Sequence, residues 1–104
     1  MAQFDVHTNT NAASQREVPY LLDIQSELLD GLATRVVVPL FRKSAFGKPV
    51  QRLHPEFDIA GVAVVMSTAE LAGIPRRNLG KKVESLVEHR SVIVSAVDLL
   101  MSGV

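Results

Sequence analysis

The sequence contains no cysteine, which excludes a disulfide framework, a thiolate nucleophile and a cysteine-bound metal. It also carries no net charge, since 11 Lys and Arg residues balance 11 Asp and Glu residues. Composition therefore gives no electrostatic argument for a nucleic acid or an anionic membrane as the main partner. No apolar run approaches the ~20 residues that span a bilayer, and the N-terminus lacks the basic and apolar regions of a signal peptide. We predict a soluble, cytoplasmic protein without a membrane partner.

Apolar residues, in contrast, are abundant. They make up 47% of the 104 residues, which is typical of a globular chain rather than a disordered one. A chain of this length can bury a single core without a disulfide or a structural metal. We therefore predict one domain over residues 1–104.

Alternating and β-branched segments predict a mainly β fold. We expect strands at 3–7, 20–26, 35–40, 50–53, 57–59, 62–66 and 79–83. Pro39 is expected at an edge or a bulge, and Ala60-Gly61 is expected to be the turn of a hairpin. Residues 28–31 are predicted to form a turn, and residues 69–72 a short helical turn that ends at Gly73. Polar loops are expected at 8–17 and 42–49.

The last seventeen residues predict a helix that runs almost to the chain end. It is expected to begin between residues 84 and 91, and its apolar positions recur at helical steps. Apolar residues also lie off this stripe, so more of the circumference is apolar than packing on one sheet requires. Two explanations remain open, a homodimer interface and deeper burial in the chain's own core. The stripe is Leu86, Ile93, Ala96, Val97 and Leu100, and the additional residues are Val92, Val94, Leu99 and Met101.

Residues able to support catalysis or phosphate binding are few. The three histidines, His7, His54 and His89, do not have the spacing of a helical metal motif, and no nucleophile stands with a base. The pairs 76–77 and 81–82 are basic, and they fit either phosphate contacts or a solvated sheet edge. From the residues alone, the interpretation is a small, neutral, dimeric binding module.

One block is more specific than these patterns. Asp23-Ile24-Gln25-Ser26-Glu27-Leu28-Leu29-Asp30, followed by Arg35-Val36-Val37-Val38-Pro39-Leu40, resembles the CcdB family of bacterial toxins. The resemblance continues through His89-Arg90 to the end of the chain. It implies an SH3-like barrel of the CcdB/MazF type with a C-terminal helix, assembled as a homodimer. It also implies a toxin that binds the DNA gyrase A subunit and traps the cleaved gyrase–DNA complex without chemistry of its own. We therefore predict a protein that is not an enzyme and has no cofactor and no metal.

The resemblance also assigns a gyrase-binding surface at the chain end. The family ends in Trp-Gly-Ile, where the tryptophan stacks on a gyrase arginine; the matching residues here are Ser102, Gly103 and Val104. Serine offers no aromatic face for a cation. Met101 retains the apolar bulk of a family phenylalanine, and Asp98 replaces an asparagine. Leu28 and Leu29 match an isoleucine pair that we place near the same surface.

Further partners follow from the same resemblance. A CcdA-type antitoxin is expected to wrap the toxin with a disordered tail, and the complex to repress its own operon, so that DNA is contacted only through the antitoxin. The loops at 8–17 and 42–49 are candidates for this groove. Two alternatives remain. One is a MazF-like endoribonuclease that uses His54, Arg76 and Arg77, and the other is a family member with an altered target, motivated by Ser102.

Overall fold

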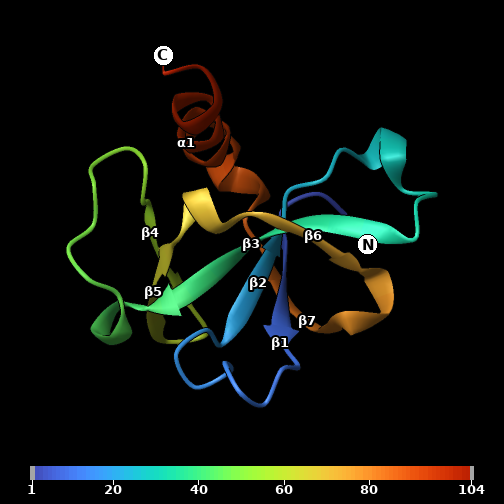
Figure 1. Cartoon of the computed structure of the whole chain (residues 1–104), viewed down its shortest axis with the longest axis horizontal. Coiled ribbons are helices and arrows are strands. Elements are labelled where there is room, and N and C mark those ends of the chain that lie inside the picture. Colours follow the sequence, from blue (N-terminus) through green and yellow to red (C-terminus); the bar gives the residue numbers. More distant parts are fainter. Residues whose placement is uncertain (1, 104) are drawn as a thin grey trace.

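The computed structural model describes residues 2–103 and shows a strongly curved antiparallel sheet with one helix across its end (Figure 1). The strand order is β4-β5-β3-β2-β1-β7, with β6 beside β3. The predicted mainly β class with a C-terminal helix is confirmed. The strands are β1 (Asp5–Asn9), β2 (Tyr20–Asp23), β3 (Thr34–Arg42), β4 (Glu56–Ile59), β5 (Val62–Met66), β6 (Ala72–Pro75) and β7 (Leu79–Ser85). The helix α1 spans Arg90–Ser102, and five single 3₁₀ turns are η1 (Glu27–Leu29), η2 (Lys43–Ala45), η3 (Thr68–Glu70), η4 (Arg76–Asn78) and η5 (Val87–His89).

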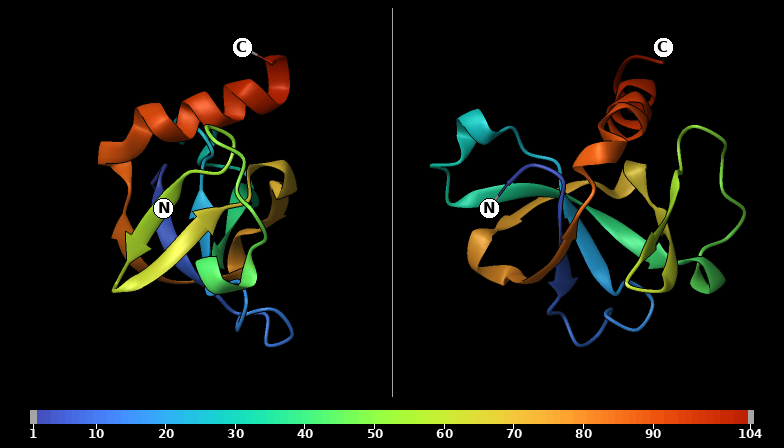
Figure 2. Two further views of the ribbon diagram at one scale, coloured as in Figure 1. Left: turned by 90° about the vertical axis from the view of Figure 1, so that its left-hand side faces the viewer. Right: turned by 180° about the vertical axis from the view of Figure 1, so that it is seen from behind.

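The curvature of the sheet turns it into a half-barrel. The long strand β3 pairs with β2 along one edge, while its other edge pairs first with β6 and then with β5. The two edges of the sheet come close together, because the turn of the β4–β5 hairpin approaches β7. There the Ala60 amide donates to Glu84 Oε1 at 3.3 Å. Apolar residues inside this curve form one core, closed by Ile93 and Ala96 of α1. Figure 2 shows α1 lying across the open end of the half-barrel.

A glycine permits the close approach of β7 to β1. A Cβ atom added at Gly80 would lie 2.0 Å from Thr8 Oγ1 and 2.7 Å from the Thr8 carbonyl oxygen. The pairing of these strands contains register shifts on either side of His7, as expected where a bulge bends a strand. Any side chain at position 80 would therefore force β7 away from β1.

Several strand predictions are confirmed with shifted bounds. Residues 60 and 61 form the hairpin turn, with φ of 51° and 84°, the left-handed values that a two-residue hairpin loop requires. The first strand begins at Asp5 rather than residue 3, and β2 ends at Asp23. Pro39 lies inside β3, not at its end, in the interval where the strand changes partner from β6 to β5. On the edge of β3 that faces β5 and β6, the Pro39 carbonyl accepts from the Ser67 amide. Proline lacks an N–H, and on this edge position 39 lies between the two strand pairings, so no ladder hydrogen bond is lost.

Two predictions were wrong. Residues 50–53 are not extended, because the His54 amide donates to the Val50 carbonyl and Arg52 adopts a φ of 71°. The helical turn expected at 69–72 is η3, one residue earlier, and residues 72–75 then form strand β6. Gly73 does not end a helix; it pairs with Val36 of β3, so tertiary pairing overrides the local signal.

Candidate partner-binding surfaces

The end of α1 presents the first candidate surface. Ile93 and Ala96 face the core, whereas Val92, Leu100 and Met101 are exposed, and the Met101 side chain is 73% accessible. The sequence left open a homodimer interface or deeper burial in the chain's own core. Deeper burial does not account for these three residues, because they are exposed. An exposed methionine of this kind is typical of a partner-binding surface.

The last turn of α1 fixes the backbone of this surface. Gly103 is the C-cap in the left-handed region, with φ of 73°, and its amide donates to the Leu99 carbonyl at 3.0 Å. The Ser102 hydroxyl donates to the Asp98 carbonyl at 2.8 Å, so this hydroxyl is bonded to its own helix. Asp98 is exposed and forms no ion pair within residues 2–103. Val104, the last residue of the predicted surface, lies outside the described residues.

The turn η1 presents a second apolar surface. Leu28 is 94% accessible, and Leu29 and Leu32 are each about half accessible. The sequence singled out Leu28 and Leu29 but not Leu32, although its position directly after a predicted turn was a usable signal. Three exposed leucines within five residues are unusual for a monomer surface, and such a patch indicates an interaction site.

The polar residues of the block that resembles the CcdB family form the support of η1. Arg35 is fully buried, and its guanidinium contacts the buried Asp23 at 2.7 Å and the Asp30 carboxylate at 3.1 Å. Gln25 uses both ends of its amide, accepting from the Val36 amide and donating to the Leu29 carbonyl. Asp23, Gln25 and Arg35 are therefore enclosed and act as a scaffold, whereas residues 27–30 of the block reach solvent.

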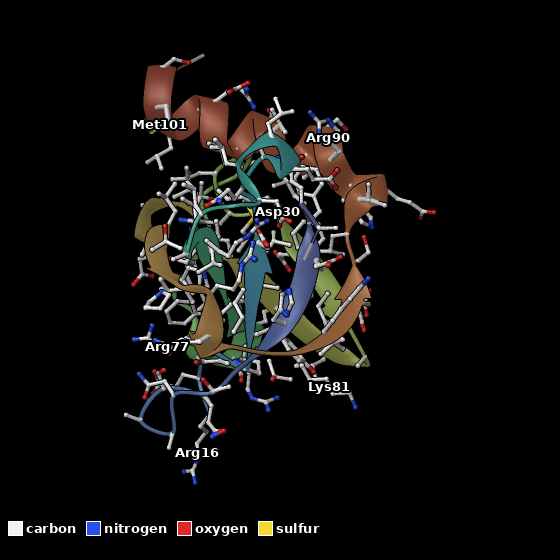
Figure 3. All side chains as sticks on the ribbon, turned by 90° about the vertical axis from the view of Figure 1, so that its right-hand side faces the viewer. Arg16, Asp30, Arg77, Lys81, Arg90 and Met101 are labelled. Atoms are coloured by element: carbon white, nitrogen blue, oxygen red, sulfur yellow. The ribbon has the colours of Figure 1, made fainter. Side chains whose placement is uncertain are left out.

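These two surfaces lie at the same end of the molecule without touching. In Figures 1 and 2, η1 and α1 both lie at the top of the fold, and they are set apart from each other along that end. Figure 3 shows Asp30 beneath η1, at the end that carries Met101, while Arg16, Arg77 and Lys81 lie toward the opposite end. The structure thus places the predicted residues Leu28, Leu29 and Met101 at one end, but as two separate patches in one chain.

A hollow of about 650 Å³ lies by the loop between β1 and β2. Its apolar lining comes mainly from strands β2, β3 and β6, and its polar lining from the β1–β2 loop and from β1, η3 and η4. The loop predicted at 8–17 contributes to it, whereas Arg42 and Lys43 line a separate, shallower hollow of about 530 Å³. The lining residues of the first hollow are Asn9, Thr10, Asn11, Ser14, Glu17, Val18, Leu21, Pro39, Phe41, Glu70, Ile74 and Asn78.

The residues considered for RNA cleavage are not brought together. His54 Nδ1 accepts from the Val50 amide at 2.8 Å, and its ring packs edge-on against Phe46. Arg76 is bonded to Asp30 through Nη2 at 2.9 Å. Figures 1 and 2 place the loop before β4 and the turn η4 on opposite sides of the fold. His7 is buried in β1 and contacts the Gly80 carbonyl through Nδ1.

Within residues 2–103, no group of three His, Asp or Glu side chains has the arrangement of a metal site. None of the helices described is long and apolar enough to cross a membrane.

Solved structures with the same fold come from mycobacterial proteins. An endoribonuclease in complex with its cognate antitoxin, from a mycobacterial species, superposes with a TM-score of 0.72 at 11% identity, covering 94% of this chain and 91% of that chain. Mycobacterium tuberculosis toxin MazF-mt6 gives a TM-score of 0.71 at 15% identity, covering 90% and 92%. A further mycobacterial endoribonuclease gives 0.67 at 12% identity, covering 94% and 88%.

These structures correct one prediction. The sequence led us to expect a protein that is not an enzyme, and this expectation is contradicted because two of these three proteins with the same fold are endoribonucleases. At such low identity the likeness establishes the fold alone. The absence of catalytic activity therefore cannot be inferred from the architecture.

The sequence itself provides the assignment of family. The model of the family described as CcdB protein matches residues 3–103, which is nearly the whole chain and includes both η1 and α1. The matched region contains the buried Asp23–Arg35 pair and the C-cap at Gly103. The chain belongs to the CcdB family.

Proposed function

We propose that this protein is the toxin of a toxin–antitoxin system that binds the DNA gyrase A subunit and stabilises the cleaved gyrase–DNA complex. The observation that carries the proposal is the exposure of Leu28, Leu29 and Met101, at family-matched positions, at one end of the fold. A few well-packed side chains near the centre of an interface supply most of its binding energy. Asp98, exposed and without an ion pair inside residues 2–103, adds a carboxylate that suits an arginine of the target.

The position of Ser102 changes how this surface binds. Its hydroxyl is bonded to the Asp98 carbonyl, so it offers neither an aromatic face nor a free donor to a partner. Loss of an aromatic hot spot lowers affinity by about thirtyfold, which corresponds to about 2 kcal/mol. The neighbouring Met101 supplies the apolar contact in our proposal. We expect weaker gyrase binding than a tryptophan at position 102 would give.

We also propose that the active form is a homodimer. The support is the apolar surface of α1 that remains exposed in the single chain at Val92 and Leu100, apart from Met101, which is left for the target. Assembly about a two-fold axis would bury part of this surface and bring the η1 and α1 patches of two chains into one larger face. Sedimentation at micromolar concentration tests this directly, and a monomer would refute it.

For the antitoxin, the hollow beside the β1–β2 loop is the proposed binding groove. Its apolar lining from Leu21, Phe41 and Ile74 suits the alternating apolar residues of a disordered segment that folds as it binds. A toxin of this fold has been solved with its cognate antitoxin, which supports an antitoxin partner. We propose a CcdA-type antitoxin, which also carries the contacts to operator DNA.

The decisive experiment is cleavage of supercoiled plasmid by gyrase, with ATP and increasing amounts of the protein. Linear DNA should accumulate with the natural sequence, less with a Leu28→Ala/Met101→Ala variant, and normally with the control Val50→Ala, which truncates an exposed side chain in the loop between η2 and β4. A folded dimer that gives no linear DNA would refute gyrase poisoning. A long RNA incubated with the same preparation reports on the endoribonuclease alternative.

A further inference from the structure

Arg76 holds η1 from a distant part of the chain. It begins η4, 46 residues after Asp30, and its Nη2 donates to the Asp30 carboxylate at 2.9 Å and also to the Asp30 main-chain carbonyl. Its own amide donates to the Ala33 carbonyl at 2.8 Å. Both the backbone and the side chain of Arg76 therefore fasten the segment that follows η1.

Asp30 is the shared point of this attachment. The carboxylate oxygen that accepts from Arg76 also contacts the buried Arg35 at 3.1 Å. The Asp30 amide closes η1 by donating to the Glu27 carbonyl. One residue thus connects the core of the protein, through Arg35, and the surface turn η4, through Arg76, to the end of η1.

The position of Arg76 is not explained by stability alone. Its Nε is buried and has no hydrogen-bond partner among residues 2–103, which opposes folding because a buried donor has lost its water. The ion pair with Asp30 is partly exposed, and pairs of this kind contribute little to stability. What the arrangement does accomplish is to restrain a turn that displays Leu28 and Leu29.

We propose that Arg76 is a positioning residue for target recognition, which acts through Asp30 to hold η1 in the conformation that presents Leu28 and Leu29. This inference rests on the proposed function, because it takes the partner of η1 to be the gyrase A subunit. A turn held in its bound conformation loses less freedom on binding, and the affinity is correspondingly higher. Arg76 need not touch the partner for this effect.

The test compares Arg76→Met and Arg76→Lys with Arg77→Met, a matched control that removes a neighbouring exposed charge without an ion pair within residues 2–103. Affinity for the breakage–reunion fragment of the gyrase A subunit is measured by surface plasmon resonance. Arg76→Met should weaken binding by at least about fivefold, the lower bound of the cost of ordering two more side chains. Arg76→Lys retains a donor for Asp30 and should restore most of the affinity, while Arg77→Met should bind as the natural protein does.

Amide hydrogen exchange gives a readout that does not depend on gyrase. In Arg76→Met the amides of Leu29, Asp30 and Leu32, which are bonded within the turn, should exchange faster, whereas core amides of β2 and β3 should not. Unchanged exchange in η1 would overturn the inference, as would faster exchange with unchanged affinity. Failure of the natural protein to bind gyrase would refute the proposed function, and with it a role of Arg76 in gyrase recognition.

A variant of the contact surface separates positioning from general destabilisation. If Arg76 acts through Leu28, then adding Arg76→Met to Leu28→Ala should weaken binding less than it does in the natural background. If the affinity losses of Arg76→Met and Leu28→Ala simply multiply in the double variant, Arg76 does not act through Leu28, and the proposal is contradicted.

Discussion

Truncation of Leu28 distinguishes a leucine that binds a partner from one that stabilises the fold. At 94% accessibility, Leu28 loses almost no buried area when it is changed to alanine. The free energy of unfolding should therefore change by less than about 0.5 kcal/mol. Leu22 in β2 is the buried control, because its side chain is fully enclosed in the core. Leu22→Ala should therefore destabilise the protein by about 2–5 kcal/mol.

Binding should show the reverse order. Burying a whole leucine side chain against a partner contributes about 2 kcal/mol, so Leu28→Ala should lower affinity for the gyrase A fragment by about thirtyfold. Chemical denaturation measures the stability of each variant, and surface plasmon resonance measures affinity at a concentration where both remain folded. A loss of stability in Leu28→Ala comparable to that of Leu22→Ala would refute the structural reasoning. Unchanged affinity together with unchanged stability would refute the assignment of η1 as a binding surface.

Three further changes test separate features of the structure. Gly80→Ala should destabilise the protein by about 1–3 kcal/mol in thermal or chemical unfolding, because the new Cβ would overlap Thr8 at the β1–β7 pairing; an unchanged midpoint would contradict that close approach. Arg35→Met should reduce the free energy of unfolding by about 3–5 kcal/mol, since it leaves the carboxylate of Asp23 buried and unpaired, and Lys43→Met, which removes an exposed ion pair, should have little effect. Ser102→Trp should raise gyrase affinity by about thirtyfold and lower the concentration needed for plasmid cleavage, and no gain would indicate that the target surface has changed.

The elements that the sequence predicted well are those fixed by neighbouring residues. The turn at residues 60 and 61 follows from an Ala-Gly pair between two apolar runs, and both residues adopt left-handed φ values. The helix begins at Arg90, inside the predicted interval, and ends at a glycine C-cap. In each case the signal and the structure lie within a few residues of one another.

The elements that it predicted poorly depend on distant partners. Residues 72–75 contain Gly73 and Pro75, which favour a helix end locally, yet they form β6 because β3 offers them an unpaired edge. Whether the α1 surface is covered by a second chain also depends on a partner that the sequence does not contain. The exposure of Val92, Leu100 and Met101 became visible only once α1 was placed across the half-barrel.

The candidate binding surface shows the same division. The block from Asp23 to Asp30 identified the family, but its polar residues Asp23 and Gln25 are buried. Asp23 pairs with Val37 across β2 and β3, which places Arg35 diagonally opposite and explains how two residues twelve positions apart form a buried ion pair. Neither the role of Asp30 as a shared acceptor nor the contribution of Arg76 from η4 was predictable, because both require the sheet to be assembled.

In our proposal, recognition of the family and recognition of the target rest on different residues. The Asp23–Arg35 pair and Gln25 are enclosed, so a change in them is expected to act through folding. Leu28, Met101 and Ser102 are exposed, so a change in them is expected to alter binding while the fold persists. A chain can keep the enclosed set and exchange the exposed set without losing its architecture. Family membership thus defines the scaffold, and in our proposal the target is decided by the side chains displayed on η1 and at the end of α1.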